Sequence, residues 1–201
     1  QEVDLTRRVG GQRLRRAGRI KFVEDVTTNQ LTTAQNMIFV NSRERRTGNT
    51  VFGFSEDGRT CLLAIAMSRG GVGDIDIKTI DGTNYLFMAG AMGRRGGVFK
   101  SCNLNTMQCR ETQFPDRNHI SARFGGFSVN NDASIIYFSH HGQNGDLVGH
   151  SLTPNGGAFD LGVETRRCSA VNGPTLTSDM AFATGVEVSP NNSNIVYTTS
   201  H

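Results

Sequence analysis

The chain lacks the features on which several large protein classes depend. Its 201 residues contain no Trp, only 4 Pro and only 4 Cys. No apolar run is long enough to cross a membrane, and no stretch repeats its apolar residues with the period of an amphipathic helix. These absences argue against a helical bundle and a membrane-spanning helix. With 24 Gly, the composition favours a turn-rich all-β protein.

Sequence signatures of common enzymes are missing as well. The chain has no Gly-x-Ser-x-Gly nucleophile turn and no glycine-rich phosphate loop. It also has no pair of carboxylates at a spacing typical of acid–base catalysis. The sequence therefore contains no complete catalytic set.

A strand–turn–strand pattern is written four times along the chain. In the clearest copy an apolar run ends at Val129, a polar Asn-Asn-Asp turn follows, and an aromatic and β-branched run begins at Ile135. The four copies span residues 31–40, 74–88, 126–139 and 185–197. Aligned on the second strand, Ile38, Leu86, Ile136 and Val196 are equivalent, at steps of 48, 50 and 60 residues. A period near 50 that is built from short strands is typical of a β-propeller.

We therefore expect an all-β fold, a β-propeller with about four visible four-stranded blades, in a single domain over residues 1–201. The expected blades are 31–65, 74–112, 126–163, and 181–201 plus 10–26. In the fourth blade the C-terminal stretch supplies two inner strands and the N-terminal stretch two outer strands, which would close the ring and cover both sheet edges. The alternative is a segment of a larger propeller.

Four cysteines bear on the compartment. Cys102 and Cys109 bracket a polar turn between two short strands, whereas Cys61 and Cys168 are isolated. A hairpin can bring the first pair within bonding distance, and a zinc site would need a second close pair. We predict a Cys102–Cys109 disulfide and a secreted or extracellular protein. A glycosylation sequon at Asn191 agrees with that location.

Positive charge is concentrated near the start of the chain. The net charge is +3, and residues 1–46 hold ten Lys or Arg against five Asp or Glu. The cations before residue 22 are Arg7, Arg8, Arg13, Arg15, Arg16, Arg19 and Lys21. They could bind an anion or nucleic acid, or they could be solvated side chains that discourage edge-to-edge strand pairing. Phe22 is the only aromatic residue among them, so we favour the second interpretation and disfavour nucleic acid.

Two stretches carry a family resemblance. Gly-Val-Glu-Val-Ser-Pro-Asn-Asn-Ser-Asn-Ile-Val-Tyr at 185–197 and Gly-Asp-Leu-Val-Gly-His-Ser-Leu at 145–152 resemble the NHL repeat. They are also similar to repeats of SMP-30/gluconolactonase and strictosidine-synthase-like propellers. The likeness covers about residues 30–201 at the level of the fold. The Asp that commonly follows the second strand of an NHL repeat is replaced here by Ser42, Gly90, His140 and Ser200.

The resemblance implies that ligands bind in the loops after the second strands. The candidate ligand-binding residues in those loops are basic or imidazole side chains: Arg43, Arg94, Arg95, His140 and His141. These five residues, called the rim here, would suit an acidic glycan or protein. Exposed loop charge is the simpler interpretation.

Metal sites are the alternative. His140, His141 and His201 could ligate zinc, as the resemblance to the zinc-dependent amidating lyase suggests. A calcium-dependent lactonase would instead need converging carboxylates, for which Asp74, Asp76 and Glu187 are the candidates. We favour polar loops for the histidines and solvated strand residues for the carboxylates, and expect no cofactor, with Zn or Ca as the alternative.

The sequence thus favours an extracellular, non-catalytic binding or structural module that contacts a protein or glycan through propeller loops. A metal-dependent lyase or lactonase is the first alternative, and anion or nucleic-acid binding through the N-terminal Arg cluster is the second. Homo- and hetero-oligomers both remain open.

Overall fold

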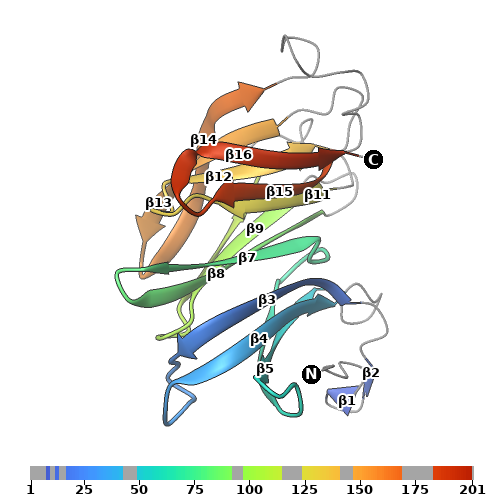
Figure 1. Cartoon of the computed structure of the whole chain (residues 1–201), viewed down its shortest axis with the longest axis vertical. Coiled ribbons are helices and arrows are strands. Elements are labelled where there is room, and N and C mark those ends of the chain that lie inside the picture. Colours follow the sequence, from blue (N-terminus) through green and yellow to red (C-terminus); the bar gives the residue numbers. More distant parts are fainter. Residues whose placement is uncertain are drawn as a thin grey trace.

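Every regular element of the described chain is a β-strand. The computed structural model describes residues 8–9, 12–13, 17–42, 49–91, 97–114, 124–140, 147–168 and 183–200. The strands form a series of antiparallel sheets that follow one another along the chain (Figure 1). The expected all-β architecture with propeller-like blades is confirmed.

Three sheets have four strands each, in chain order. The first contains β3 (Ala17–Val26), β4 (Gln35–Ser42), β5 (Thr50–Ser55) and β6 (Cys61–Ala66). The second contains β7 (Asp74–Ile80), β8 (Thr83–Ala91), β9 (Gly97–Asn103) and β10 (Cys109–Gln113). The third contains β11 (Phe124–Val129), β12 (Ile135–His140), β13 (Leu147–Asn155) and β14 (Ala158–Cys168).

Two smaller sheets complete the described structure. The strands β15 (Ala183–Ser189) and β16 (Asn192–Ser200) form a hairpin that continues the array after the third sheet. The short strands β1 (Arg8–Val9) and β2 (Gln12–Arg13) pair only with each other among the described residues.

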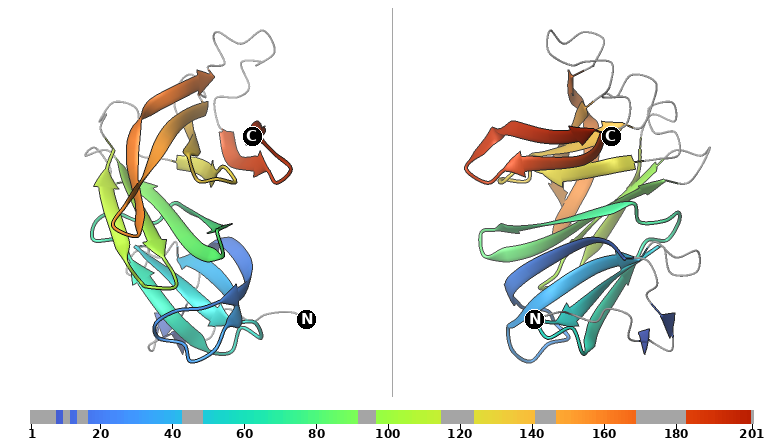
Figure 2. Two further views of the ribbon diagram at one scale, coloured as in Figure 1. Left: turned by 90° about the vertical axis from the view of Figure 1, so that its left-hand side faces the viewer. Right: turned by 45° about the vertical axis from the view of Figure 1, so that its right-hand side comes forward.

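The sheets stack face to face in a curved array (Figure 2). The first strand of each sheet lies toward the inner side, where β3 contacts β7, β7 contacts β11, and β11 contacts β15. The described sheets do not close into a ring. The inner side is therefore where the first strands of separate sheets come together.

Alternating side chains fill the space between neighbouring sheets. On β8, Leu86 and Met88 pack into a cluster shared with the first sheet, whereas Phe87 and Ala89 pack into a cluster shared with the third. Because successive residues of a strand point to opposite faces, a strand between two sheets must be apolar on both. This explains the continuous apolar run from Tyr85 to Ala89.

The repeat alignment of the second strands agrees with the structure. Ile38, Leu86, Ile136 and Val196 lie in β4, β8, β12 and β16, each the second strand of its sheet. Each of these strands pairs with the strand before it. The sequence period therefore reports equivalent positions in successive sheets.

The expected assignment of the N-terminal strands to the fourth blade was wrong. Residues 17–26 do not supply an outer strand to a fourth blade, because β3 pairs with β4 and is the first strand of the first sheet. Gly18 lies within β3, and a Cβ there would collide with the side chain of Asn41, which accepts a hydrogen bond from Arg19 N at 2.6 Å. Glycine is needed for this close approach. The expected closure of the ring by the two ends of the chain is accordingly not observed in the described strands.

The predicted disulfide is present. Cys102 and Cys109 lie directly opposite each other in β9 and β10, and their sulfurs are bonded. Cys102 is buried against the first sheet, while β10 is largely exposed. The bond ties an outer strand with little core of its own to a strand that is well packed. Cys61 has a free thiol.

Removing this bond should destabilise the fold measurably. The disulfide closes a loop with a sequence separation of 7, for which loss of loop-closure constraint costs about 2 kcal/mol. We expect Cys102→Ser/Cys109→Ser to lower the free energy of unfolding by that amount in urea titrations. Adding reductant should destabilise the native protein and leave the double variant unchanged. Equal stability of the two proteins would contradict the assigned role.

Candidate functional site

Most residues of the predicted rim and of the predicted histidine metal site are not described by the structure. Arg43, Arg94, Arg95, His141 and His201 are outside the described residues. His140 ends β12, where its backbone pairs with Phe124, and its side chain is not described. The structure therefore neither brings these side chains together nor separates them, and both predictions stay predictions.

The described strands do show where the rim loops begin. Arg19, near the start of β3, contacts Asp74 at the start of β7 and Phe127 in β11. The starts of the first strands thus lie together. Their antiparallel partners end at the same edge, since Ala17 pairs with Ser42 and Asp74 with Ala89. The strands β4, β8 and β12 consequently end at one common edge of the array.

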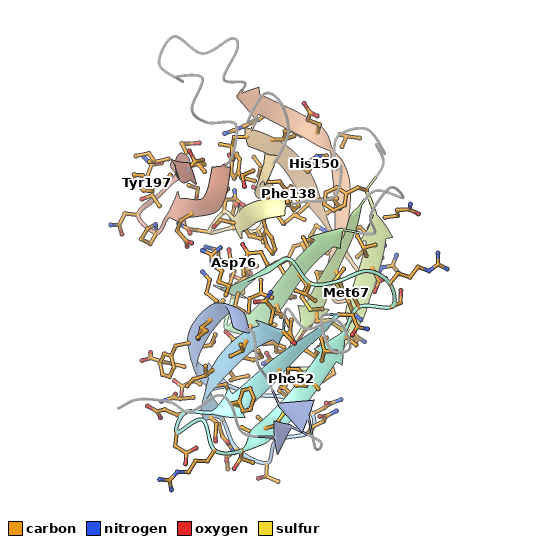
Figure 3. The ribbon with its side chains drawn as sticks, turned by 90° about the vertical axis from the view of Figure 1, so that its right-hand side faces the viewer. Phe52, Met67, Asp76, Phe138, His150 and Tyr197 are labelled. Carbon is orange, nitrogen blue, oxygen red and sulfur yellow. A yellow bond between two sulfur atoms is a disulfide. The ribbon has the colours of Figure 1, made fainter. Side chains whose placement is uncertain are left out.

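A network of charged side chains crosses the inner side and joins all four first strands. Its members are Arg19 and Lys21 on β3, Asp74, Asp76 and Lys78 on β7, Ser128 on β11 and Glu187 on β15. We call these seven residues the axial network. In Figure 3, Asp76 lies on the inner side, between the first strands of the neighbouring sheets. The alternation Arg-x-Lys and Asp-x-Asp-x-Lys places these side chains on one face of each strand.

Arg19 is the hub of the axial network. Its Nη1 donates to Asp74 Oδ2 at 3.0 Å and to the carbonyl oxygen of Phe127 at 3.1 Å. Its Nη2 pairs with Glu187. One planar guanidinium thus reaches β7, β11 and β15 at once, which a lysine ammonium could not do with the same geometry.

The two aspartates of β7 hold the next sheet through its backbone. Asp74 Oδ2 accepts a hydrogen bond from Phe127 N at 3.0 Å, and Asp76 Oδ2 accepts one from Val129 N at 2.9 Å. The i, i+2 spacing of the carboxylates matches the i, i+2 spacing of the N–H groups. Backbone donors on the unpaired edge of β11 are therefore satisfied by side chains and not by a neighbouring strand.

Two lysines of the axial network lie beside the Asp76 carboxylate. Its side chain is 0% exposed, Lys21 Nζ lies 2.9 Å from Oδ1, and Lys78 Nζ lies 3.8 Å from Oδ2. Ser128 Oγ donates to Asp76 Oδ2 at 3.2 Å and accepts from Val188 N at 3.1 Å. That hydroxyl extends the connection from β7 through β11 to β15.

At Asp74 and Arg19, burial and the neighbouring charges shift the pKa in opposite directions. Burial raises the pKa of Asp74 above its ordinary value, although Arg19 and the N–H groups of Phe127 and Ile75 act in the opposite direction. Burial alone would lower the pKa of Arg19, but the carboxylates of Asp74, Glu187 and Asp76 together raise it. The guanidinium is thus held as a cation at every physiological pH.

These contacts correct two interpretations of the sequence. Asp74 and Asp76 are not solvated strand residues, because both are buried and hydrogen-bonded. Arg19 and Lys21 do not belong to a free basic patch or to a solvated ribbon, because both point into the axial network. The sequence does contain a sign of these contacts. Near the start of β3 and of β7, charged residues occupy every second position, with opposite charges on the two strands, and comparing the two strands would reveal the match.

The arrangement is suited to holding strands together. The described carboxylates of the inner side accept from cations and backbone N–H groups, which leaves little capacity for a metal ion or a substrate proton. Among the residues that the structure describes, no three His, Cys, Asp or Glu side chains form a metal-binding group. In the same part of the chain, no helix is both long and apolar enough to span a membrane.

Comparisons with known proteins add no family assignment. No family model matches the chain, and no curated protein matches it significantly. The propeller-like architecture therefore rests on the sheets themselves.

Neutralising the Asp76 carboxylate of the axial network should destabilise the fold. Asp76→Asn removes the carboxylate that pairs with Lys78 and leaves Lys21 with Glu187 alone, so we expect a loss of about 3 kcal/mol of unfolding free energy in urea. Asp81→Asn is the matched control, because Asp81 is exposed in the β7–β8 turn and Asn tolerates its positive φ of 49°. Stability of Asp76→Asn within 0.5 kcal/mol of the control, roughly the scatter of surface substitutions, would contradict this role.

The raised pKa of Asp74 predicts a definite pH dependence. The native protein keeps a proton on Asp74 at pH values where the unfolded chain has already released it, so this group's contribution to stability falls as pH rises through that window. We expect the stability of the native protein relative to Asp74→Asn to decrease as the pH rises above about 4, the ordinary pKa of an aspartate. Unfolding titrations of both proteins across that range measure the difference. A relative stability that increases with pH would show a lowered pKa instead.

Proposed function

We propose that this chain is an extracellular, non-catalytic binding module of the NHL-like propeller type, which contacts an acidic glycan or protein through the rim. The observation that carries the proposal is the commitment of the inner carboxylates and cations to strand–strand contacts. A propeller enzyme uses such axial side chains on its substrate or metal, whereas here they bond to β11 and to one another. Binding is then left to the loops.

Two further features support an extracellular location. The Cys102–Cys109 disulfide is the kind of bond that persists in oxidising compartments. Asn191 lies exposed in the turn between β15 and β16, where an attached glycan would meet solvent. Neither feature depends on the rim.

Charge in the rim gives the expected class of partner. Arg43, Arg94 and Arg95 belong to loops that leave the array at one edge, and each is a planar donor suited to carboxylate or sulfate groups. Arg19 does not contribute there because its charge is compensated within the axial network.

The test is binding of a sulfated glycosaminoglycan oligosaccharide to the immobilised protein. Arg94→Ser should weaken binding roughly fivefold, the equivalent of about 1 kcal/mol for one exposed charge contact. Arg59→Ser is the control, because Arg59 is an exposed arginine in the β5–β6 turn, away from the edge where β4, β8 and β12 end. Equal weakening by both variants would indicate unspecific attraction by net charge.

Two outcomes would favour the enzyme alternative instead. One is near-stoichiometric zinc or calcium in protein purified without chelator, lost in His140→Ala or His141→Ala. The other is turnover of a lactone or a peptide amide precursor that His141→Ala abolishes. Either result would overturn the non-catalytic proposal.

A further inference from the structure

A second candidate binding site lies at the opposite end of the first strands from the rim. A hollow of about 560 Å³ opens between the end of β3 and the β7–β8 hairpin. Its wall includes Phe22, Glu24, Asp25, Ile77, Thr79 and Asn84. The volume falls in the range of small-molecule sites in proteins.

A β-bulge supplies the acidic side of the hollow. Val23 pairs with Met37 and Val26 with Gln35, so β3 has one residue more than β4 between these pairs. The extra length falls on Glu24 and Asp25, and Asn36 Oδ1 accepts from Asp25 N at 3.2 Å. Both side chains are exposed, and neither carboxylate has a hydrogen bond or ion pair with another described residue. Bulges commonly redirect side chains at binding sites.

A buried amide supplies unused donors. Asn84 is only 4% exposed and lines the hollow. Its Oδ1 accepts from Thr79 Oγ1 at 2.6 Å, but its Nδ2 donates to no residue that the structure describes. A buried amide with unused N–H donors costs free energy unless water or a ligand accepts from it.

The remaining wall is apolar. Phe22 is 51% exposed, an unusual position for a phenylalanine, and Ile77 is half-buried beside it. The hollow thus combines an accessible aromatic ring, two acceptor-only carboxylates and one donor-only amide group within a single wall.

From this combination we propose that the hollow binds a neutral saccharide. A sugar hydroxyl both donates and accepts, so one ligand satisfies the carboxylates and the Asn84 amide, while its C–H face packs on Phe22. An amine cation only donates and would leave the amide unused. An anion would meet two carboxylates, and no lysine or arginine lines the hollow. The site is separate from the rim, so it goes beyond the proposed function and does not depend on it.

The experiment is an NMR titration of the ¹⁵N-labelled full chain with methyl glycosides of glucose, galactose, mannose and N-acetylglucosamine. We expect at least one glycoside to shift the Asn84 side-chain amide resonances saturably, with a dissociation constant on the order of 1 mM. Phe22→Ala should weaken that binding roughly fivefold, because it removes the stacking surface. Since Phe22 is largely exposed, this variant should fold, which its thermal unfolding checks.

Tyr197→Ala is the matched control. Tyr197, labelled in Figure 3, lies on β16 and is 59% exposed. It is not among the residues that line the hollow. The inference is overturned if no glycoside shifts the Asn84 amide, or if the two variants weaken binding equally. It is also overturned if putrescine binds at these residues and the glycosides do not. Rim variants such as Arg94→Ser should leave glycoside binding unchanged, so failure here and failure of the rim proposal are distinguishable.

Discussion

The Arg19 guanidinium is the contact on which the arrangement of the sheets most depends. Apolar packing between sheets is extensive but not directional, so it specifies burial better than register. The guanidinium must reach Asp74, the Phe127 carbonyl and Glu187 together, and this sets how β7, β11 and β15 lie relative to β3. A shift of any first strand by one residue would turn its charged face into an apolar cluster.

The same contacts explain why charged residues occupy the most crowded part of the array. First strands of neighbouring sheets cannot pair with one another as a continuous sheet, yet their backbone N–H groups are buried. Asp74 and Asp76 accept from those N–H groups, and Lys21 and Lys78 compensate the charge this introduces. Such buried ion pairs contribute less to stability than to register, because desolvation offsets most of their attraction.

Sequence analysis predicted the part of the fold that is periodic. The second strands repeat a turn followed by β-branched and aromatic residues, so Ile38, Leu86, Ile136 and Val196 could be aligned. The disulfide was predictable for a similarly local reason, since a hairpin turn separates its cysteines. The role of β3 could not be predicted in this way. Its charged side chains are typical of a solvated surface, and their partners lie 55 or more residues away in the sequence. Asn84 was not predicted as a site residue, because whether a side-chain N–H group lacks an acceptor depends on how the folded chain packs around it.

The two ends of the first strands differ in chemistry, and this has a consequence for binding. In the sequence, arginines follow β4 and β8, whereas at the other end of the first strands the β3 bulge presents Glu24 and Asp25 beside Phe22. Between them the axial network pairs its cations with carboxylates. Because Glu24 and Asp25 repel anions, the acidic ligand proposed for the rim would be disfavoured at the hollow. It would therefore not compete there with a neutral saccharide.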